Sequence, residues 1–115
     1  NRSDVHTDHQ IAFKAIYSCT KNFRYPFIKS ILMGETISET DFTPALIENV
    51  FIPNIFVDVT DFFEQKIKIF KVYESEVMHN NLPRSIKAIT ALSMYRGSNI
   101  GVDFAETFML LKEIR

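Results

Sequence analysis

Apolar residues recur with helical spacing soon after the start of the chain. Within residues 8–21 they fall at i, i+1, i+4, i+5 and i+8, namely Ile11, Ala12, Ala15, Ile16 and Cys19. This stripe predicts an amphipathic helix. Thr7 or Asp8 can cap its first turn, and Pro26 ends the segment. Because Cys19 belongs to the apolar stripe, we expect it to be a buried, inert thiol.

Two further helices are indicated later in the chain. Asp61, with Glu64 three places on, predicts a capped helix start, and this helix runs to about Ser75. Its apolar residues form two faces, Phe63/Ile67/Phe70 and Phe62/Ile69/Tyr73. We expect Phe62, Phe63 and Phe70 in the core rather than in a ligand groove. Pro83 fits the first turn of a third helix, and Gly97 is a natural stop for it. The apolar stripe of this third helix consists of Ala88, Ala91, Leu92 and Tyr95.

Strand-like segments separate these helices. Residues 29–35 resemble a strand that leads into a polar loop at 35–45, and residues 46–52 are compatible with a short strand. Residues 55–59 are the clearest strand because β-branched and aromatic residues dominate them. Residues 104–114 are apolar without a clean period, so a helix and a strand both stay open. Strands alternating with helices predict the α/β class, although about three of each is few for an independent doubly wound sheet.

Composition narrows the class of protein. The chain has 115 residues, of which 46% are apolar and 23% charged, as is typical of one globular domain or part of one. The net charge of -1 indicates no basic field for nucleic acid or an anionic membrane. No apolar run approaches the roughly 20 residues of a membrane span, and no secretory leader is visible. A single cysteine excludes an internal disulfide and fits a reducing, cytoplasmic compartment.

The segment from Asp4 to His9 gathers most of the metal-binding chemistry. His6 and His9 stand three residues apart near the expected helix start, so their imidazoles can converge, and a neighbouring carboxylate can orient a ring. Spacing alone leaves two interpretations equally open: a zinc site, or helix capping with surface histidines. A hydrolytic zinc site needs three protein ligands, and the chain offers no second cluster. His79 lies in a polar loop, and we expect it to be exposed.

Other residues with catalytic chemistry carry weaker signals. The chain lacks a nucleophile elbow and a phosphate-binding glycine loop. Arg84 and Arg96 could bind a sugar-linked phosphate, but a surface charge for Arg84 and a buried ion pair for Arg96 are favoured. Glu106 stands among apolar residues. We expect it to be buried and paired, either with Arg96 or with the helix that carries His9.

A family resemblance enters at the segment Asp4-Val5-His6-Thr7-Asp8-His9, which resembles the D-x-H/N-x-D-H block of the PIG-L/LmbE-like deacetylases. Further matches follow in the family's order across nearly the whole chain: residues 51–60 (FIPNIFVDVT), Lys66 with residues 73–75 (YES), residues 83–85 (PRS), residues 96–97 (RG) and residues 105–108 (AETF). Each match is short, but the ordered set is specific.

The resemblance implies a Rossmann-like α/β fold and a zinc-dependent hydrolase that removes the N-acetyl group from GlcNAc-type amino sugars. By the same resemblance, His9 corresponds to a zinc ligand. His6 corresponds to the histidine that stabilises the oxyanion or protonates the departing amine, and Asp8 to the carboxylate that orients this histidine. Asp4 is a weaker candidate for a supporting role. The expected cofactor is zinc, and the expected partner is an N-acetylated amino-sugar substrate.

The sequence departs from the family pattern at one place. The family's other two zinc ligands and its general-base Asp belong to an A-H-P-D-D-E block, and no His-Pro-Asp-Asp occurs here. We therefore expect on the order of 100 further residues before Asn1, carrying most of a doubly wound parallel sheet. Residues 1–115 are then the C-terminal part of one domain, inactive alone and prone to associate with the missing part or a second copy. The alternative is a truncated or degenerate relative that serves in binding or assembly.

Overall fold

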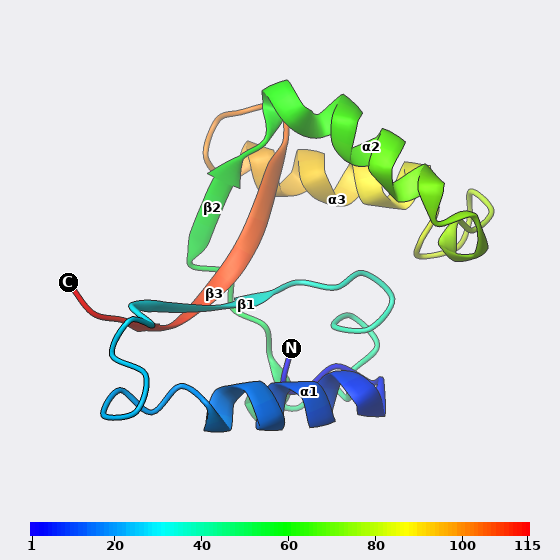
Figure 1. Ribbon diagram of the computed structural model, residues 1–115. Helices are drawn as coiled ribbons and strands as arrows, with labels where there is room; N and C mark the ends of the chain where they lie inside the picture. Colours follow the sequence, from blue (N-terminus) through cyan, green and yellow to red (C-terminus); the bar gives the residue numbers. More distant parts are fainter. The chain divides into compact units, whose positions relative to one another are not determined.

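The computed structural model describes residues 1–115, which form three α-helices and three strands (Figure 1). The three strands, β1 (Ser30–Gly34), β2 (Ile55–Asp58) and β3 (Ala105–Glu113), form one sheet in the order β1-β3-β2. The chain divides into two compact units: unit 1 comprises Asn1–Ile55 and Phe108–Arg115, and unit 2 comprises Phe56–Thr107. The mixed α/β class is therefore confirmed, whereas a Rossmann-like sheet stays a prediction. None of the helices combines the length and the apolar character that crossing a membrane requires.

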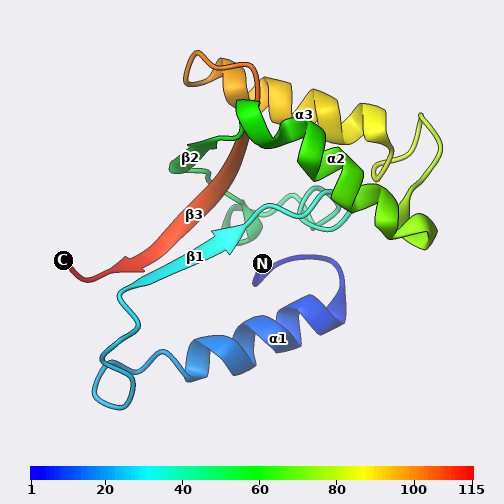
Figure 2. The same ribbon diagram turned by 45° about the horizontal axis from the view of Figure 1, so that its top comes forward.

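In unit 1, the strand β1 (Ser30–Gly34) pairs with the second half of β3 (Ala105–Glu113). The pair is antiparallel, in a register that begins with Ser30 opposite Glu113, and Figure 2 shows the two strands side by side. The first predicted strand is thus confirmed. Residues 104–114, for which helix and strand were both open, form a strand.

Helix α1 (Thr7–Ser18) belongs to unit 1 and confirms the first predicted helix. Its N-cap is His6, rather than Thr7 or Asp8 as the sequence suggested. The ring nitrogen Nδ1 of His6 accepts a hydrogen bond of 3.2 Å from the backbone N–H of Asp8. The imidazole therefore satisfies a backbone donor that serine or aspartate side chains satisfy in most helices.

The predicted burial of Cys19, the last residue of the α1 stripe, is wrong. No α1 residue is buried, and Ile11 and Ile16 are 64% and 66% exposed. Cys19, expected to be a buried thiol, is the C-cap of α1 and is exposed. A helical apolar stripe becomes buried only where a second element covers it. This stripe is only partly covered, because an open cavity lies between α1 and β1.

The short strand considered at 46–52 is also wrong. A 3-10 helix, η1 (Ile47–Asn49), occupies the segment. The Leu46 N–H donates to the Pro44 carbonyl at 2.7 Å, and the Asn49 N–H donates to the Leu46 carbonyl at 2.9 Å. These two consecutive turns coil the backbone and leave no extended stretch that could pair with a strand.

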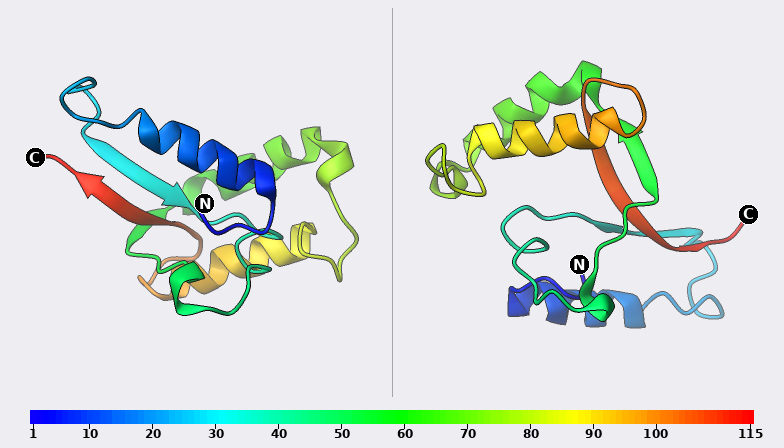
Figure 3. Two further views of the ribbon diagram at one scale, coloured as in Figure 1. Left: turned by 90° about the horizontal axis from the view of Figure 1, so that it is seen from below. Right: turned by 180° about the vertical axis from the view of Figure 1, so that it is seen from behind.

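Unit 2 contains most of β2 (Ile55–Asp58), helices α2 (Phe63–Val72) and α3 (Ile86–Ser98), and the first part of β3 (Figure 3). A 3-10 turn, η2 (Thr60–Phe62), leads from β2 into α2. The clearest predicted strand and the second predicted helix are confirmed. The expected Asp61 cap is wrong, because Phe62 is the N-cap of α2 and makes no side-chain hydrogen bond there.

The core of unit 2 is built around two stacked rings. The centroids of Phe63 and Phe104 lie 3.9 Å apart, and the ring planes differ by 2°. Phe63 is buried together with Ile67, Ile89 and Ala105. Of the three residues that the sequence analysis assigned to the core, Phe63 is buried and Phe70 is half-buried. The assignment is wrong for Phe62, which is 64% exposed.

Helix α3 begins later than the sequence suggested. Ser85 is its N-cap, and the fully buried Ser85 hydroxyl accepts from the Ala88 N–H at 3.1 Å. Pro83 therefore precedes the cap and does not lie in the first helical turn. A serine cap satisfies a helix N–H that would otherwise lack a partner, which fixes the start of α3 at this residue.

The buried face of α3 differs from the predicted stripe. Ile89, Ser93 and Gly97 are buried at i, i+4 and i+8, whereas Tyr95 of the predicted stripe is 61% exposed. Gly97 does not stop the helix, which continues to Ser98. A Cβ at position 97 would stand 2.5 Å from the Val102 carbonyl oxygen. Glycine is required here because the backbone of residues 102–103 packs directly against α3.

The charged residues of unit 2 form surface pairs. Glu106 was expected to be buried, but its Oε1 lies 2.8 Å from Lys66 Nζ and its side chain is 39% exposed. Arg84 pairs with Glu76 at 3.4 Å, as expected for a surface charge. Arg96 is half-buried, and its guanidinium lies 5.4 Å from the centroid of the neighbouring tyrosine ring.

Candidate functional site

The candidate site lies in unit 1, where Asp4 is fully buried just before α1. The Thr40 hydroxyl donates to Asp4 Oδ1 at 2.8 Å, and His9 Nδ1 lies 2.9 Å from Asp4 Oδ2. The backbone nitrogen of Asn1 is 3.4 Å from the same Oδ2. A buried carboxylate needs such partners, because removing an unpaired charge from water is very unfavourable. Asp4, the weaker candidate in the sequence, is thus the most firmly held residue of the segment.

The contact with Asp4 determines which nitrogen of His9 is available. A carboxylate only accepts hydrogen bonds, so His9 donates from Nδ1, and in the neutral ring Nε2 then carries the free lone pair. The His9 side chain is 38% exposed, so this lone pair is open to a ligand. Carboxylate–histidine pairs of this kind orient the ring and raise its basicity in metal centres.

In His6 the two ring nitrogens have the opposite roles from those in His9. Its Nδ1 accepts from the Asp8 backbone N–H, so in the neutral ring the proton is on Nε2. The His6 and His9 rings stack with centroids 5.1 Å apart and planes 25° apart. The segment therefore brings together one imidazole that can donate a hydrogen bond and one that can bind a metal ion.

Asp8 does not orient His6 through its carboxylate in this structure. The shortest distance from the Asp8 carboxylate to His6 Nδ1 is 4.0 Å, which is too long for a hydrogen bond. The Asp8 side chain is 82% exposed. The residue holds the His6 ring through its backbone N–H, because the polypeptide enters α1 at this point.

Thr40 is a site residue that the sequence analysis missed. It is buried, its hydroxyl donates to Asp4, and the same oxygen accepts from the Thr36 N–H at 2.9 Å. It thereby connects the loop after β1 to the segment before α1. A threonine 36 residues from Asp4 in a polar loop carries no spacing signal. Only the general rule that a buried carboxylate needs donors suggests that such a residue exists.

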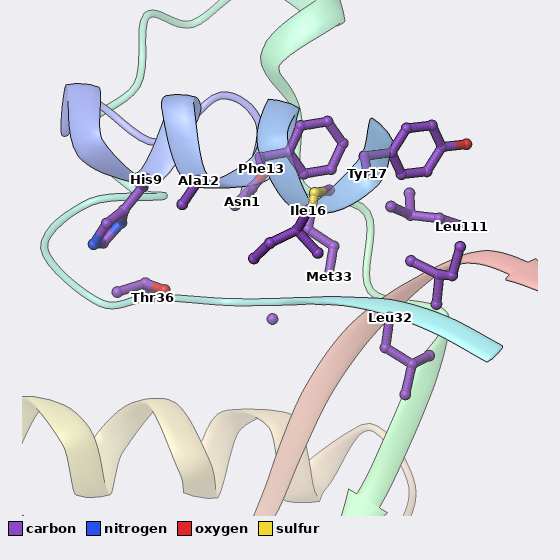
Figure 4. A pocket seen from close by; sticks show the side chains of 12 residues that line it. Asn1, His9, Ala12, Phe13, Ile16, Tyr17, Leu32, Met33, Thr36 and Leu111 are labelled. Atoms are coloured by element: carbon purple, nitrogen blue, oxygen red, sulfur yellow. The ribbon is translucent and has the colours of Figure 1, made fainter. Parts of the chain in front are cut away.

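An open cavity of about 340 Å³ lies beside His9, between α1 and β1 (Figure 4). His9 and Thr36 stand at one end, and the apolar side chains of Phe13, Ile16 and Tyr17 continue along α1. The rest of the lining comes from Asn1, Ala12, Ile31, Leu32, Met33, Gly34 and Leu111. This volume is at the lower end of the range for small-molecule sites.

The loop at 35–45 lines two cavities of unit 1. Thr36 contributes to the cavity beside His9. Glu35 and Thr40 belong to a second open cavity of about 310 Å³, whose other walls include Pro44 and Phe51. The loop therefore supports the Asp4 carboxylate and also borders the space next to His9.

The structure brings His6, His9 and Asp4 together and leaves His79 exposed in its loop, as predicted for that residue. Among residues 1–115, no three His, Cys, Asp or Glu side chains are grouped so that they could hold a metal ion. In chemical terms, His9 is suited to one position of a metal centre. Comparisons with protein-family models, curated proteins and solved structures find no match to the chain. A function is therefore inferred from the residues and their geometry.

Proposed function

We propose that this chain is the C-terminal part of a zinc-dependent N-deacetylase that removes the acetyl group from a GlcNAc-type amino sugar in the cytoplasm. The observation that carries the proposal is the 2.9 Å contact between the buried Asp4 carboxylate and His9 Nδ1. It leaves Nε2 of an accessible imidazole as a free lone pair. The ordered resemblance to the PIG-L/LmbE-like deacetylases assigns zinc binding to the same histidine.

The donor set fits zinc at one position. His9 would hold the ion through Nε2, and Asp4 would keep the ring in the required tautomer. Zinc, when bound, supplies Lewis-acid polarisation of the acetyl carbonyl and lowers the pKa of a water molecule. The proposal requires two more ligands and a general base from residues outside these 115, as the resemblance implies.

His6 is suited to the other chemical task of amide hydrolysis. Its Nε2–H can donate to the oxygen on which negative charge develops, or give a proton to the departing amine. The stacking of His6 on His9 places this donor beside the metal-binding ring. The backbone N–H of Asp8 holds the His6 ring, so His6 is the catalytic residue and Asp8 positions it.

The cavity beside His9 supports a small substrate with both polar and apolar parts. His9 and Thr36 form its polar end, and Ala12 and Ile16 lie on the adjoining apolar wall (Figure 4). An N-acetyl group has the same division, with a carbonyl oxygen on one side and a methyl group on the other. The cavity is therefore the proposed place of the acetamido group.

The test is acetate release by the protein that includes the natural sequence upstream of Asn1. We expect release from an N-acetylglucosaminyl substrate, and a loss of more than about 100-fold in His9→Ala, since loss of a ligand exceeds the 10–100-fold effect of losing its orienting partner. His79→Ala is the matched control, because His79 is an exposed loop histidine, and it should retain full activity. Full activity in His9→Ala would remove this residue from the site. Absence of a His-Pro-Asp-Asp sequence upstream would favour the non-catalytic alternative.

A further inference from the structure

The loop between α1 and β1, residues 19–29, combines exposed aromatic side chains with basic charge. Phe23 and Phe27 are 80% and 74% exposed, and Tyr25 is 37% exposed. The charged residues among them are Lys21, Arg24 and Lys29, all basic and all exposed. The loop projects beyond the C-terminal end of α1 (Figures 2 and 3).

The tip of this loop is an ordered turn. The N–H groups of Arg24 and Tyr25 both donate to the Lys21 carbonyl at 3.0 Å, and the Ile28 N–H donates to the Tyr25 carbonyl at 3.2 Å. The rings of Tyr25 and Phe27 meet edge to face with centroids 6.0 Å apart. The backbone hydrogen bonds thus order the turn that carries these exposed aromatic side chains.

Charge is strongly segregated along the chain. The 115 residues include 13 basic and 14 acidic residues, and residues 9–34 contain four of the basic and none of the acidic ones. The rest therefore carries nine basic and 14 acidic residues, a net charge of -5. The overall charge of -1 conceals a local excess of +4 around this loop. An anionic surface would attract residues 9–34 and repel the rest of the chain, whose net charge is negative.

We propose that residues 19–29 dock the protein on an anionic lipid bilayer. In this arrangement Phe23 and Phe27 insert at the boundary between headgroups and acyl chains, while Lys21, Arg24 and Lys29 contact the headgroups. A bilayer accounts for two exposed phenylalanines, which have no polar group to keep in water. Single-stranded nucleic acid also binds basic and aromatic residues, but it needs a basic groove along its backbone, and the rest of the chain is acidic.

The test is co-sedimentation of the full chain with phosphatidylcholine vesicles that contain or lack phosphatidylserine. We expect binding to the phosphatidylserine vesicles only, weakened by added salt. Lys21→Gln/Arg24→Gln should weaken binding about 30-fold, at about 1 kcal/mol for each charge. Lys68→Gln/Lys71→Gln is the matched control, because it removes two exposed charges from α2, and it should change binding less than about twofold.

A second pair of variants tests the aromatic residues. Phe23→Ser/Phe27→Ser should weaken vesicle binding about tenfold or more. Phe42→Ser/Phe62→Ser is the matched control, because these two residues are 59% and 64% exposed. It should not weaken vesicle binding. All substituted residues are exposed, so thermal unfolding should be unchanged. Equal binding to both vesicle types, equal losses in loop and control variants, or binding to an oligothymidylate without binding to vesicles would each overturn the proposal. None of these outcomes depends on deacetylase activity.

Discussion

The carboxylate of Asp4, with no exposed surface, lies 2.9 Å from His9 Nδ1. This contact predicts opposite neutral tautomers for the two histidines of the segment. His9 should carry its proton on Nδ1 and His6 on Nε2. Nitrogen-15 NMR of the imidazole rings at a pH where both are neutral measures this directly. Asp4→Asn should abolish the tautomer preference of the His9 ring and leave the tautomer of the His6 ring unchanged. The same tautomer in both rings would show that the hydrogen bonds are not those described.

The Thr40 hydroxyl supplies the other partner of the Asp4 carboxylate. Thr40→Val removes this donor with little change of volume, and should lower the free energy of unfolding by about 1.5–3 kcal/mol, as for hydrogen bonds to charged groups. Denaturant unfolding provides the measurement. The control is Thr7→Val at the exposed first residue of α1, where a change within about 0.5 kcal/mol is expected. Equal effects in the two variants would contradict the role of Thr40.

His6 has a structural and a proposed catalytic role, and one pair of variants separates them. His6→Ala removes the N-cap of α1 and should lower stability by about 0.5–2 kcal/mol. Asparagine is a good N-cap, so His6→Asn should recover most of that loss. In the protein with its natural upstream sequence, both variants should reduce kcat by about 10²–10⁴-fold, because neither offers an imidazole N–H. Recovery of kcat in His6→Asn would reduce the role of His6 to capping.

Gly97 packs against the backbone that returns from α3. A Cβ there would lie 2.5 Å from the Val102 carbonyl oxygen and 2.9 Å from Asp103 backbone atoms. The neighbouring atoms belong to the backbone and cannot move away by a change of rotamer. Gly97→Ala should therefore destabilise unit 2 by about 1–3 kcal/mol, despite the higher helix propensity of alanine. Ser98→Ala at the next, exposed position is the control and should change the free energy of unfolding by less than about 0.5 kcal/mol. A stabilised Gly97→Ala protein would mean that the turn at 102–103 packs less closely.

The Asp58 side chain, at the end of β2, predicts that the stability of the protein depends on pH at acidic pH. Hydrogen bonds from the Thr60 hydroxyl and the Thr60 N–H lower the pKa of Asp58 below its ordinary value of 3.8. Because the folded pKa is the lower one, the associated stabilisation is complete above 3.8 and is lost as pH falls through the folded pKa. Carbon-13 NMR titration of the carboxyl group measures the shift. Thr60→Val should move the pKa of Asp58 back toward 3.8, and an unchanged value would assign the shift to another cause.

Local patterns predicted the secondary structure where a single strong signal was present. The helix over α1, the strand β2 and the Phe63/Ile67 face of α2 follow from apolar spacing and β-branched composition. The errors arise where tertiary contacts decide. Tyr95 was placed on the buried face of α3, but the close approach of the 102–103 backbone selects the face that carries Gly97. Periodicity identifies an apolar stripe and does not reveal what covers it.

The candidate site was predictable as a segment but not as a geometry. The spacing of His6 and His9 and the family resemblance indicated the six residues from Asp4 to His9 as the candidate segment. The arrangement of donors required the structure, because Asp4 depends on Thr40, a residue far away in the sequence. The carboxylate of Asp8, which the resemblance assigned to orienting His6, lies 4.0 Å from His6 Nδ1, and the backbone N–H of that residue holds the ring.

The central claim is that His9, held by Asp4, is a zinc ligand. The most direct test is the zinc content of the protein purified with its natural upstream sequence, compared between the unaltered protein, His9→Ala, Asp4→Asn and His79→Ala. We predict stoichiometric zinc in the unaltered protein and in His79→Ala, loss of zinc in His9→Ala, and zinc affinity lowered about 10–100-fold in Asp4→Asn. Stoichiometric zinc in His9→Ala, or no zinc in any of the four proteins, would contradict the claim.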